Sequence, residues 1–175
     1  MLSKNEIREI CREKLAKIAE KEEKSFRLRE ELLPILSRCN HIAIFASLKD
    51  EIDTFPLIEA LLKLDKSIYL PRVEKQDINF YQIHSLDELK VSDNKYRIRE
   101  PQGDNPVNPN ELEVIVCPGV AFDNNNNRLG HGKGYYDRYL LTCSAYKIGI
   151  CYKEQLFIEI PTNDQDIKMD EVYAY

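Results

Sequence analysis

The chain of 175 residues has the length of one domain, long enough to bury roughly 70% of the surface that the unfolded chain exposes. Its net charge of −5 argues against a nucleic acid or an anionic membrane as the main partner. There is no long apolar run and no signal-like leader, and early glutamates disfavour a transit peptide, so a cytoplasmic location is expected.

The first element predicted is a helix that starts at about residue 3. Ser3 and Glu6 have the spacing of a capping box, and an apolar stripe follows at helical spacing: Ile7, Ile10, Cys11, Leu15 and Ile18. Lys4 and Arg8 lie one turn apart on this helix. By themselves they indicate an ordinary solvated face.

A second helix is predicted from leucines and Phe26 at helical spacing, bent or ended near Pro34. It follows the charge run Lys21 to Lys24. Next, residues 41–45 predict a buried strand, and a loop containing Glu51 and Asp53 leads to a helix with Thr54 as its cap. Asp53 is explained by the electrostatics of the helix start.

Further strands are predicted at residues 67–73, 78–84, 113–117, 147–152 and 169–173, with a polar loop at 93–109. The sequence leaves open whether Arg72, in one of these strands, faces a ligand or solvent. Helices that alternate with short apolar strands predict a single α/β domain spanning residues 1–175, whose mainly parallel sheet is covered on both faces. Ligands should bind where the loops after Phe45, Leu70 and Cys117 meet.

The stretch from Pro118 to Leu140, PGVAFDNNNNRLGHGKGYYDRYL, contains four of the six glycines. We expect a long polar loop with a mobile turn at Asn124 to Asn127, a glycine-rich turn, and a helix from Tyr135 to Cys143. Glycines at 130, 132 and 134 would let backbone N–H groups face a ligand, and the helix start would favour an anion.

Charged residues flank the same turn, namely Arg128, Lys133 and Asp137. The two cations suit a phosphate, and the aspartate could reach a metal ion carried on bound phosphates. The turn fits neither a Walker A loop, which needs Ser or Thr at 134, nor a dinucleotide fingerprint, which needs glycine at 135. It therefore predicts a different phosphate site, while a tight packing turn remains the alternative.

The five cysteines are odd in number and form no C-x-x-C pair. They predict small buried thiols, and neither a disulfide framework nor a zinc site.

PGVAFD followed by RLGHGKGYYDRYL closely resembles the 5-formyltetrahydrofolate cyclo-ligase family, the 5,10-methenyltetrahydrofolate synthetases. The resemblance covers nearly the whole chain through the segments KNEIR, DEIDT, LPR, REP and KMDEV. It implies a three-layer, doubly wound α/β/α domain. It also implies ATP-dependent cyclisation of 5-formyltetrahydrofolate to 5,10-methenyltetrahydrofolate, with release of ADP and phosphate.

In the implied reaction, phosphorylation of the formyl oxygen creates a good leaving group, N10 attacks the activated carbon, and phosphate departs. The protein need supply only alignment and charge neutralisation, which agrees with the lack of a Ser-His or Cys-His arrangement. The expected partners are ATP and 5-formyltetrahydrofolate, with Mg²⁺ as cofactor, and the expected state is a monomer.

The resemblance also implies a set of site residues. Those expected to bind ATP are Lys4, Arg8, Arg128, Leu129, Gly130, His131, Gly132, Lys133, Gly134, Tyr135 and Tyr136. Those expected to bind the folate are Glu51, His131, Gly132, Lys133, Gly134 and Tyr135, and the metal ligands are Asp137 and Asp166. Lys133 and Arg128 are the catalytic candidates. His131 stands where many relatives carry arginine and is expected to be mostly neutral at pH 7.

Two other functions stay open from the residues. The chain could be a non-catalytic binder of folate or nucleotide. It could also be a phosphosugar isomerase or an acyl-transferase-like enzyme, but that chemistry needs a glutamate or other base near the glycine turn, and the sequence places none there.

Overall fold

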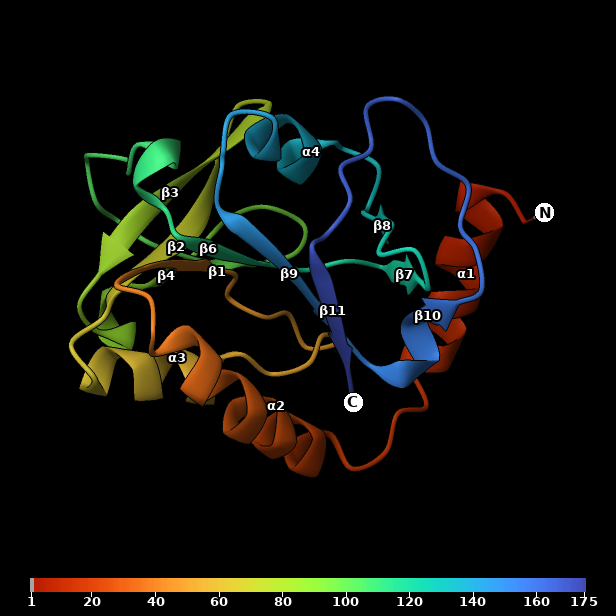
Figure 1. Cartoon of the computed structure of the whole chain (residues 1–175), viewed down its shortest axis with the longest axis horizontal. Helices are drawn as coiled ribbons and strands as arrows, with labels where there is room; N and C mark the ends of the chain where they lie inside the picture. Colours follow the sequence, from red (N-terminus) through yellow and green to blue (C-terminus); the bar gives the residue numbers. More distant parts are fainter. Residues whose placement is uncertain (1) are drawn as a thin grey trace.

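A six-stranded sheet forms the centre of the computed structural model, which describes residues 2–175 (Figure 1). The strand order is β11-β9-β6-β1-β2-β3. The strands are β1 His41–Ile44, β2 Ser67–Glu74, β3 Asp77–Ile83, β6 Val114–Cys117, β9 Tyr146–Cys151 and β11 Glu171–Ala174. Every neighbouring pair is parallel except β2 and β3.

The sheet is doubly wound about β1. The chain first adds β2 and β3 on one side of β1, then returns to add β6, β9 and β11 on the other side. The strand order therefore reverses between β1 and β6, and the carboxyl ends of these two strands are where an open α/β sheet binds ligands. This confirms the predicted fold class.

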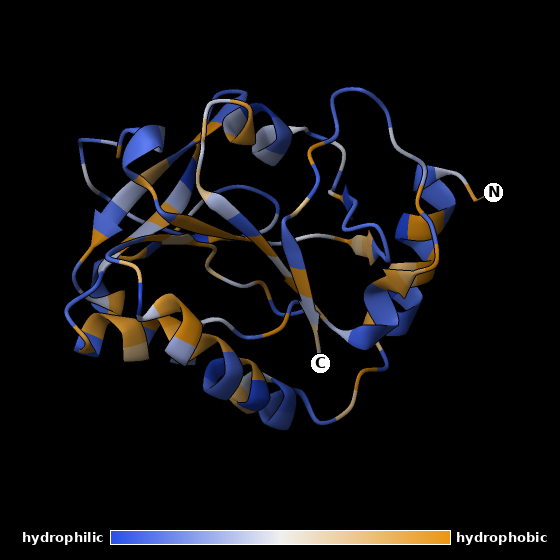
Figure 2. Cartoon of the chain, in the orientation of Figure 1, coloured by the Kyte–Doolittle hydropathy of each residue, from blue (hydrophilic) through white to orange (hydrophobic). Residues whose placement is uncertain are grey.

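Helices cover both faces of the sheet (Figure 1). One face packs against α2, Lys21–Leu36, and α3, Phe55–Lys63, and the other against α4, Tyr135–Leu140. Alternate residues of β1 separate the two layers, because Ile42 and Ile44 join the first core and Ala43 the second. Figure 2 shows hydrophobic residues along the central strands and hydrophilic residues interspersed on the surface helices.

The first helix, α1 Lys4–Leu15, lies to one side of the main sheet (Figure 1). Its predicted capping box is confirmed, since Ser3 Oγ accepts from the N–H of Glu6 and Glu6 Oε2 accepts from the N–H of Ser3. The helix ends at Leu15, so Ile18 lies beyond it. Ile7 and Cys11 are buried against a small second sheet, which attaches this helix to the central motif.

That second sheet replaces the long polar loop expected after Pro118. It consists of β7 Ala121–Asp123, β8 Arg128–Leu129 and β10 Leu156–Phe157, in the order β10-β7-β8. The asparagine run expected to be a mobile turn is the tight connection of the β7–β8 hairpin. Asp123, which is buried, accepts hydrogen bonds from the N–H groups of Asn125, Asn127 and Ile160 and from the side-chain amide of Asn127.

Several predicted boundaries also differ. Helix α2 includes the charge run from Lys21 and passes Pro34 by two residues, while α4 ends at Leu140 and not at Cys143. The polar segment before β6 contains β4 Lys90–Val91, which pairs with β5 Arg99–Glu100. Short 3₁₀ helices occupy Leu86–Glu88, Pro109–Glu111 and Lys153–Gln155.

Thr54 does precede α3, but its hydroxyl does not cap the helix. Thr54 Oγ1 donates to the carbonyl of Phe45, and Asp53 Oδ1 accepts from the N–H of Phe55 instead. The burial predicted for the cysteine thiols is confirmed for Cys11, Cys117, Cys143 and Cys151, while Cys39 is only partly buried. No helix within residues 2–175 combines the length and the apolar character needed to span a bilayer.

Candidate active site

A cavity of about 960 Å³ opens at the carboxyl end of the sheet. Its wall includes the loop after β1 with Phe45 and Glu51, the loop after β6 with Pro118 and Gly119, and Pro71 of β2. The loops expected after Phe45 and Cys117 meet here, whereas β2 continues beyond Leu70 to Glu74, so its part of the wall is strand and not loop. All the residues predicted to bind ATP, folate or metal line this one cavity, although they come from α1, the β1 loop, the glycine turn and the segment before β11.

The glycine turn at residues 130–134 leaves space for arginine side chains. Gly132 has φ +99° and Gly134 has φ +69°, a backbone region that residues with a Cβ rarely adopt. A Cβ at Gly132 would lie 3.4 Å from Arg8 Nη2, and one at Gly130 would lie 3.2 Å from Arg128 Nη1. The glycines thus allow guanidinium groups to approach the backbone that faces the cavity.

The helix after this turn is shorter than the sequence predicts, with six residues and Gly134 as its N-cap. A helix of this length adds only a limited dipole to an anion site. Positive side chains must therefore supply most of the attraction for a phosphate.

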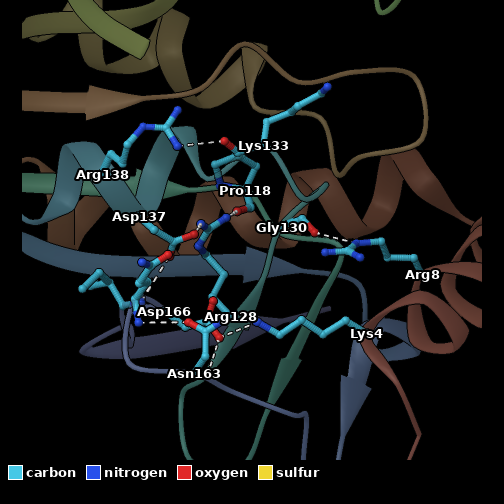
Figure 3. Close-up of polar contacts among 12 residues, drawn as sticks. Lys4, Arg8, Pro118, Arg128, Gly130, Lys133, Asp137, Arg138, Asn163 and Asp166 are labelled. Atoms are coloured by element: carbon cyan, nitrogen blue, oxygen red, sulfur yellow. Dashed lines mark hydrogen bonds and ion pairs between the residues drawn. The ribbon is translucent and has the colours of Figure 1, made fainter. Parts of the chain in front are cut away.

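The two catalytic candidates differ in their surroundings. Lys133 is exposed, and its ammonium group makes no ion pair or hydrogen bond with any of residues 2–175 (Figure 3). Arg128 is buried, and its guanidinium donates to the carbonyl of Pro118 at 3.0 Å and to Asp137 Oδ2 at 3.3 Å. Its Nε is buried without a protein partner. Lys133 is therefore available to a ligand, whereas Arg128 also holds the wall of the cavity.

The cations of α1 reach the same site across the chain (Figure 3). Arg8 Nε donates to the carbonyl of Gly130 at 3.0 Å, and Lys4 Nζ lies 2.5 Å from Asp166 Oδ2. The first helix thereby contacts both the glycine turn and the loop before β11.

The two candidate metal ligands are held close to each other through the backbone. Asp137 Oδ1 accepts from the N–H of Ile167 at 3.1 Å, and Ile167 directly follows Asp166 in the chain. Within residues 2–175 no group of three or more His, Cys, Asp or Glu side chains forms a metal cage. Two carboxylates do fit Mg²⁺, which usually takes one or two carboxylates plus phosphate oxygens and water.

The structure also distinguishes Asp166 from its acidic neighbours. Asp164 and Asp170 are absent from the cavity wall, and Asp170 Oδ2 accepts from the N–H of Lys147. Composition alone gave no reason to prefer Asp166, whereas its position in the fold does.

Glu51 lies between the main cavity and a smaller one of about 320 Å³ on the α2 side. Its Oε2 accepts from the N–H of Leu48 at 2.8 Å. Burial raises the pKa of Glu51 to about 7, against the opposing effect of the Leu48 hydrogen bond. Glu51 therefore keeps its proton to a higher pH than an ordinary glutamate does.

His131 lies at the cavity beside Tyr96, with 5.7 Å between the ring centroids. Part of the residue reaches solvent, yet the surrounding chain removes enough water to lower the pKa of His131, and the charges of Arg8 and Arg128 lower it further. The direction agrees with the neutral imidazole expected from the sequence.

Sequence reasoning missed part of the wall. The connection between β4 and β5 contributes several residues, and α4 and the segment before β11 contribute more: Asn94, Lys95, Tyr96, Ile98, Glu100, Arg138, Leu141, Asn163 and Gln165. In the sequence this connection is only a polar loop, so no local signal ties it to the glycine turn. Glu51 and Glu100 are the two glutamates of this wall.

Arg72, whose role the sequence left open, turns inward to protein groups. It pairs with Glu74 at 2.7 Å and donates to the carbonyls of Pro101 and Gly103. Its guanidinium also lies 3.8 Å from the centre of the Tyr81 ring. These contacts hold the segment after β5 against β2, and Arg72 is not part of the cavity wall.

The chain matches the model of the 5-formyltetrahydrofolate cyclo-ligase family over residues 1–174. It is 32% identical over 191 residues to a probable 5-formyltetrahydrofolate cyclo-ligase of Schizosaccharomyces pombe, covering 97% of this chain and 93% of the relative. It is 35% identical over 147 residues to the 5-formyltetrahydrofolate cyclo-ligase of Escherichia coli K12, covering 79% and 80%.

Two solved structures share the fold. The 5,10-methenyltetrahydrofolate synthetase of Aquifex aeolicus is 35% identical and superposes with a TM-score of 0.80 over 97% of this chain and 88% of that one. The 5,10-methenyltetrahydrofolate synthetase of Mycoplasma pneumoniae is 26% identical, with a TM-score of 0.78 over 98% of each chain.

Proposed function

The chain belongs to the 5-formyltetrahydrofolate cyclo-ligase family, and on that premise we propose how its cavity closes 5-formyltetrahydrofolate to 5,10-methenyltetrahydrofolate at the expense of ATP. The chain is an enzyme of folate one-carbon metabolism. The observation that carries the proposal is the convergence on one cavity of residues from four separate segments.

The cavity has two chemically different parts. Around the glycine turn it is cationic, with Lys4, Arg8 and Lys133, and this part suits the triphosphate of ATP. Along β1, β2 and β3 it is apolar apart from glutamates, with Phe45, Pro71 and Ile78 in the wall. A pterin ring fits this second part, because its flat faces need apolar contact and its N–H edge needs acceptors.

Glu51 is the acceptor that we assign to the pterin. When ionised, its carboxylate can accept two adjacent N–H groups, one from the amino group and one from the ring. Burial raises the pKa of Glu51, whereas N–H groups of a bound pterin would favour its ionised form. We expect bound folate to lower that pKa.

Lys133 is the cation that we assign to the transferring phosphoryl group. An exposed ammonium without a protein partner can follow a phosphate through the reaction, and charge stabilisation of this kind is the main contribution a protein makes to phosphoryl transfer. Arg128 adds positive charge beneath the site and orients Asp137. Arg8 and the backbone N–H groups of the glycine turn complete the set proposed to hold the nucleotide.

Asp137 and Asp166 are the residues that would hold Mg²⁺, which supplies charge neutralisation on phosphate oxygens when bound. The two carboxylates also contact Arg128 and Lys4. We further propose that the enzyme works as a monomer, since the residues proposed to bind both substrates and Mg²⁺ meet in one cavity within a single chain. We also propose that it works in the cytoplasm.

The test is the ATP-dependent rise in methenyltetrahydrofolate absorbance when 5-formyltetrahydrofolate is added to the purified protein. Turnover that requires ATP and releases phosphate in equal amount supports the proposal. Binding of both ligands without turnover would identify a non-catalytic binder of the same fold. Arg12→Ala should turn over like the parent, because Arg12 is exposed and pairs with Glu9 outside the cavity wall.

A further inference from the structure

Arg138 connects the glycine turn to the hairpin between β2 and β3. Its Nη1 donates to the carbonyl of Lys133 at 2.9 Å (Figure 3), and its Nε donates to Asp77 Oδ1 at 3.1 Å. Its Nη2 donates to the carbonyl of Gln76. One guanidinium thus binds three acceptors that belong to two different segments.

The hairpin is a firm anchor for such a contact. The strands β2 and β3 pair along their whole length up to Glu74 and Asp77, so only Lys75 and Gln76 form the turn. Helix α4 packs on the same strand pair, with the Tyr139 ring 4.8 Å from the Phe80 ring. Within the glycine turn, by contrast, His131, Gly132 and Lys133 are exposed.

Gly134 provides the space that Arg138 occupies. A Cβ at this position would lie 2.8 Å from Arg138 Nη1, closer than real side chains come. The glycine therefore serves the approach of the guanidinium to the Lys133 carbonyl as well as the positive φ of the turn.

This arrangement holds the backbone that carries the Lys133 side chain. Its ammonium has no partner among residues 2–175, so the direction of its flexible stem depends on where the backbone places its Cα. A hydrogen bond to the Lys133 carbonyl fixes the peptide plane between Lys133 and Gly134. The planar fork of arginine can fix that plane relative to a second segment, which a single ammonium group cannot do.

We propose that Arg138 is a positioning residue for the reaction, which holds Lys133 against the β2–β3 hairpin so that its ammonium meets the transferring phosphoryl group. This inference rests on the role given above to Lys133. We assign the positioning role to the two carbonyl contacts of Arg138 and not to its ion pair with Asp77. The side chains of that pair are 47% and 70% exposed, and ion pairs so exposed contribute little to stability.

The experiment is a double-mutant cycle of Arg138→Ala and Lys133→Ala, with kcat, both KM values and the thermal midpoint measured for each. We expect Arg138→Ala to lower kcat roughly tenfold, because small displacements of a catalytic group are costly, while both KM values and the midpoint stay close to the parent. In the Lys133→Ala background the same change should have almost no further effect on kcat. Arg138→Lys should not restore the rate.

Asp77→Ala is the matched control, since it removes the exposed carboxylate and leaves both carbonyl contacts of Arg138 in place. We expect parental kcat for this variant.

The outcomes separate the two proposals. If Lys133→Ala keeps parental turnover, the role of Lys133 given under the proposed function is wrong. If Lys133→Ala is impaired but Arg138→Ala is not, or if their effects on kcat multiply in the double variant, Lys133 keeps its role and the positioning role of Arg138 is overturned.

Discussion

Arg128 Nη2 lies 3.3 Å from Asp137 Oδ2, so the catalytic arginine candidate and the first metal-ligand candidate contact each other. Lys4 and Asp166 form a second pair of the same kind. In each pair, a cation proposed to face phosphate neutralises a carboxylate proposed to face Mg²⁺. When Mg²⁺ and nucleotide bind, both pairs must exchange partners or accept a third group.

This arrangement makes the magnesium requirement testable. We expect Asp137→Asn and Asp166→Asn each to raise the half-saturating Mg²⁺ concentration roughly tenfold or more, equivalent to about 1.4 kcal/mol of binding free energy. A calorimetric titration of ADP at several Mg²⁺ concentrations gives a readout independent of turnover. Asp164→Asn is the control, since Asp164 is exposed outside the cavity wall. A parental titration for Asp166→Asn would remove it from the metal site.

Lys133→Ala tests the main catalytic assignment. We expect a fall in kcat that corresponds to about 2–4 kcal/mol of lost transition-state stabilisation. This is the cost typical of removing one donor to a developing charge. The thermal midpoint should not change, because the side chain is exposed and makes no ion pair or hydrogen bond among residues 2–175. A variant that loses activity together with its fold would instead give Lys133 a structural role.

Glu51→Gln tests the pterin contact. The substitution replaces one of two charged acceptors by a donor that faces the N–H edge of the ring, so folate binding should weaken by about 1.5–3 kcal/mol. ATP affinity should stay close to the parent value. Calorimetry with each ligand checks both statements, and Glu111→Gln, an exposed change away from the cavity, is the control. Equal losses for both ligands would contradict a direct pterin contact.

The raised pKa of Glu51 also predicts how stability depends on pH. Its pKa is 4.5 in a model peptide and about 7 in the folded chain, so the folded state binds more protons between these values. Stability due to this group should therefore fall as pH rises across that window, by up to about 1.4 kcal/mol per pH unit.

Urea unfolding of parent and Glu51→Gln across the window measures this effect as a difference. The variant lacks the titrating group and should gain stability over the parent toward pH 7. Parallel curves for the two proteins would show that the carboxyl group has an ordinary pKa.

Asp123→Ala tests the hairpin that holds the glycine turn. The change leaves the buried N–H groups of Asn127 and Ile160, and the partly buried N–H of Asn125, without an acceptor, and we expect a loss of about 3 kcal/mol or more in urea unfolding. Asn124→Ala, an exposed change in the same turn, should be nearly neutral.

The same aspartate should contribute to acid sensitivity. Burial alone would raise the pKa of Asp123, but hydrogen bonds from Asn127, Ile160 and Asn125 outweigh burial and hold it below the ordinary value. Its stabilisation is then present above the ordinary pKa and is lost as pH falls toward the lowered one. Acid unfolding of Asp123→Ala should accordingly show a shallower pH dependence than the parent.

Much of this fold could be predicted from local pattern. The strands of the main sheet are short apolar runs, and the capping box of Ser3 marks the start of α1 within one residue. The β7–β8 hairpin could not be predicted in this way, because its strands have only three and two residues and its turn is a run of asparagines. Its register depends on the buried carboxylate of Asp123.

The candidate site, too, could be predicted only in part. The glycine turn and its flanking charges were visible from spacing, but Lys4, Arg8 and Asp166 came from the family resemblance, since nothing local distinguishes them from solvated charges. Arg138 and Glu100 were missed because their importance depends on which segments the fold brings together. The side chain that caps α3 was also mispredicted. Asp53, and not the adjacent Thr54, accepts from the N–H of Phe55, because the Thr54 hydroxyl bonds to the carbonyl of Phe45.

The Lys4–Asp166 contact joins residues 162 positions apart, and this separation has a consequence for synthesis of the protein. At 5–20 residues per second, a ribosome adds Asp166 roughly 8–32 s after Lys4. For most of that interval α1 lacks the hairpin that buries Ile7 and Cys11, and for all of it α1 lacks the loop that pairs with Lys4. The apolar side of α1 is therefore open to chaperones until the hairpin is made, and the Lys4–Asp166 contact forms only when translation is almost complete.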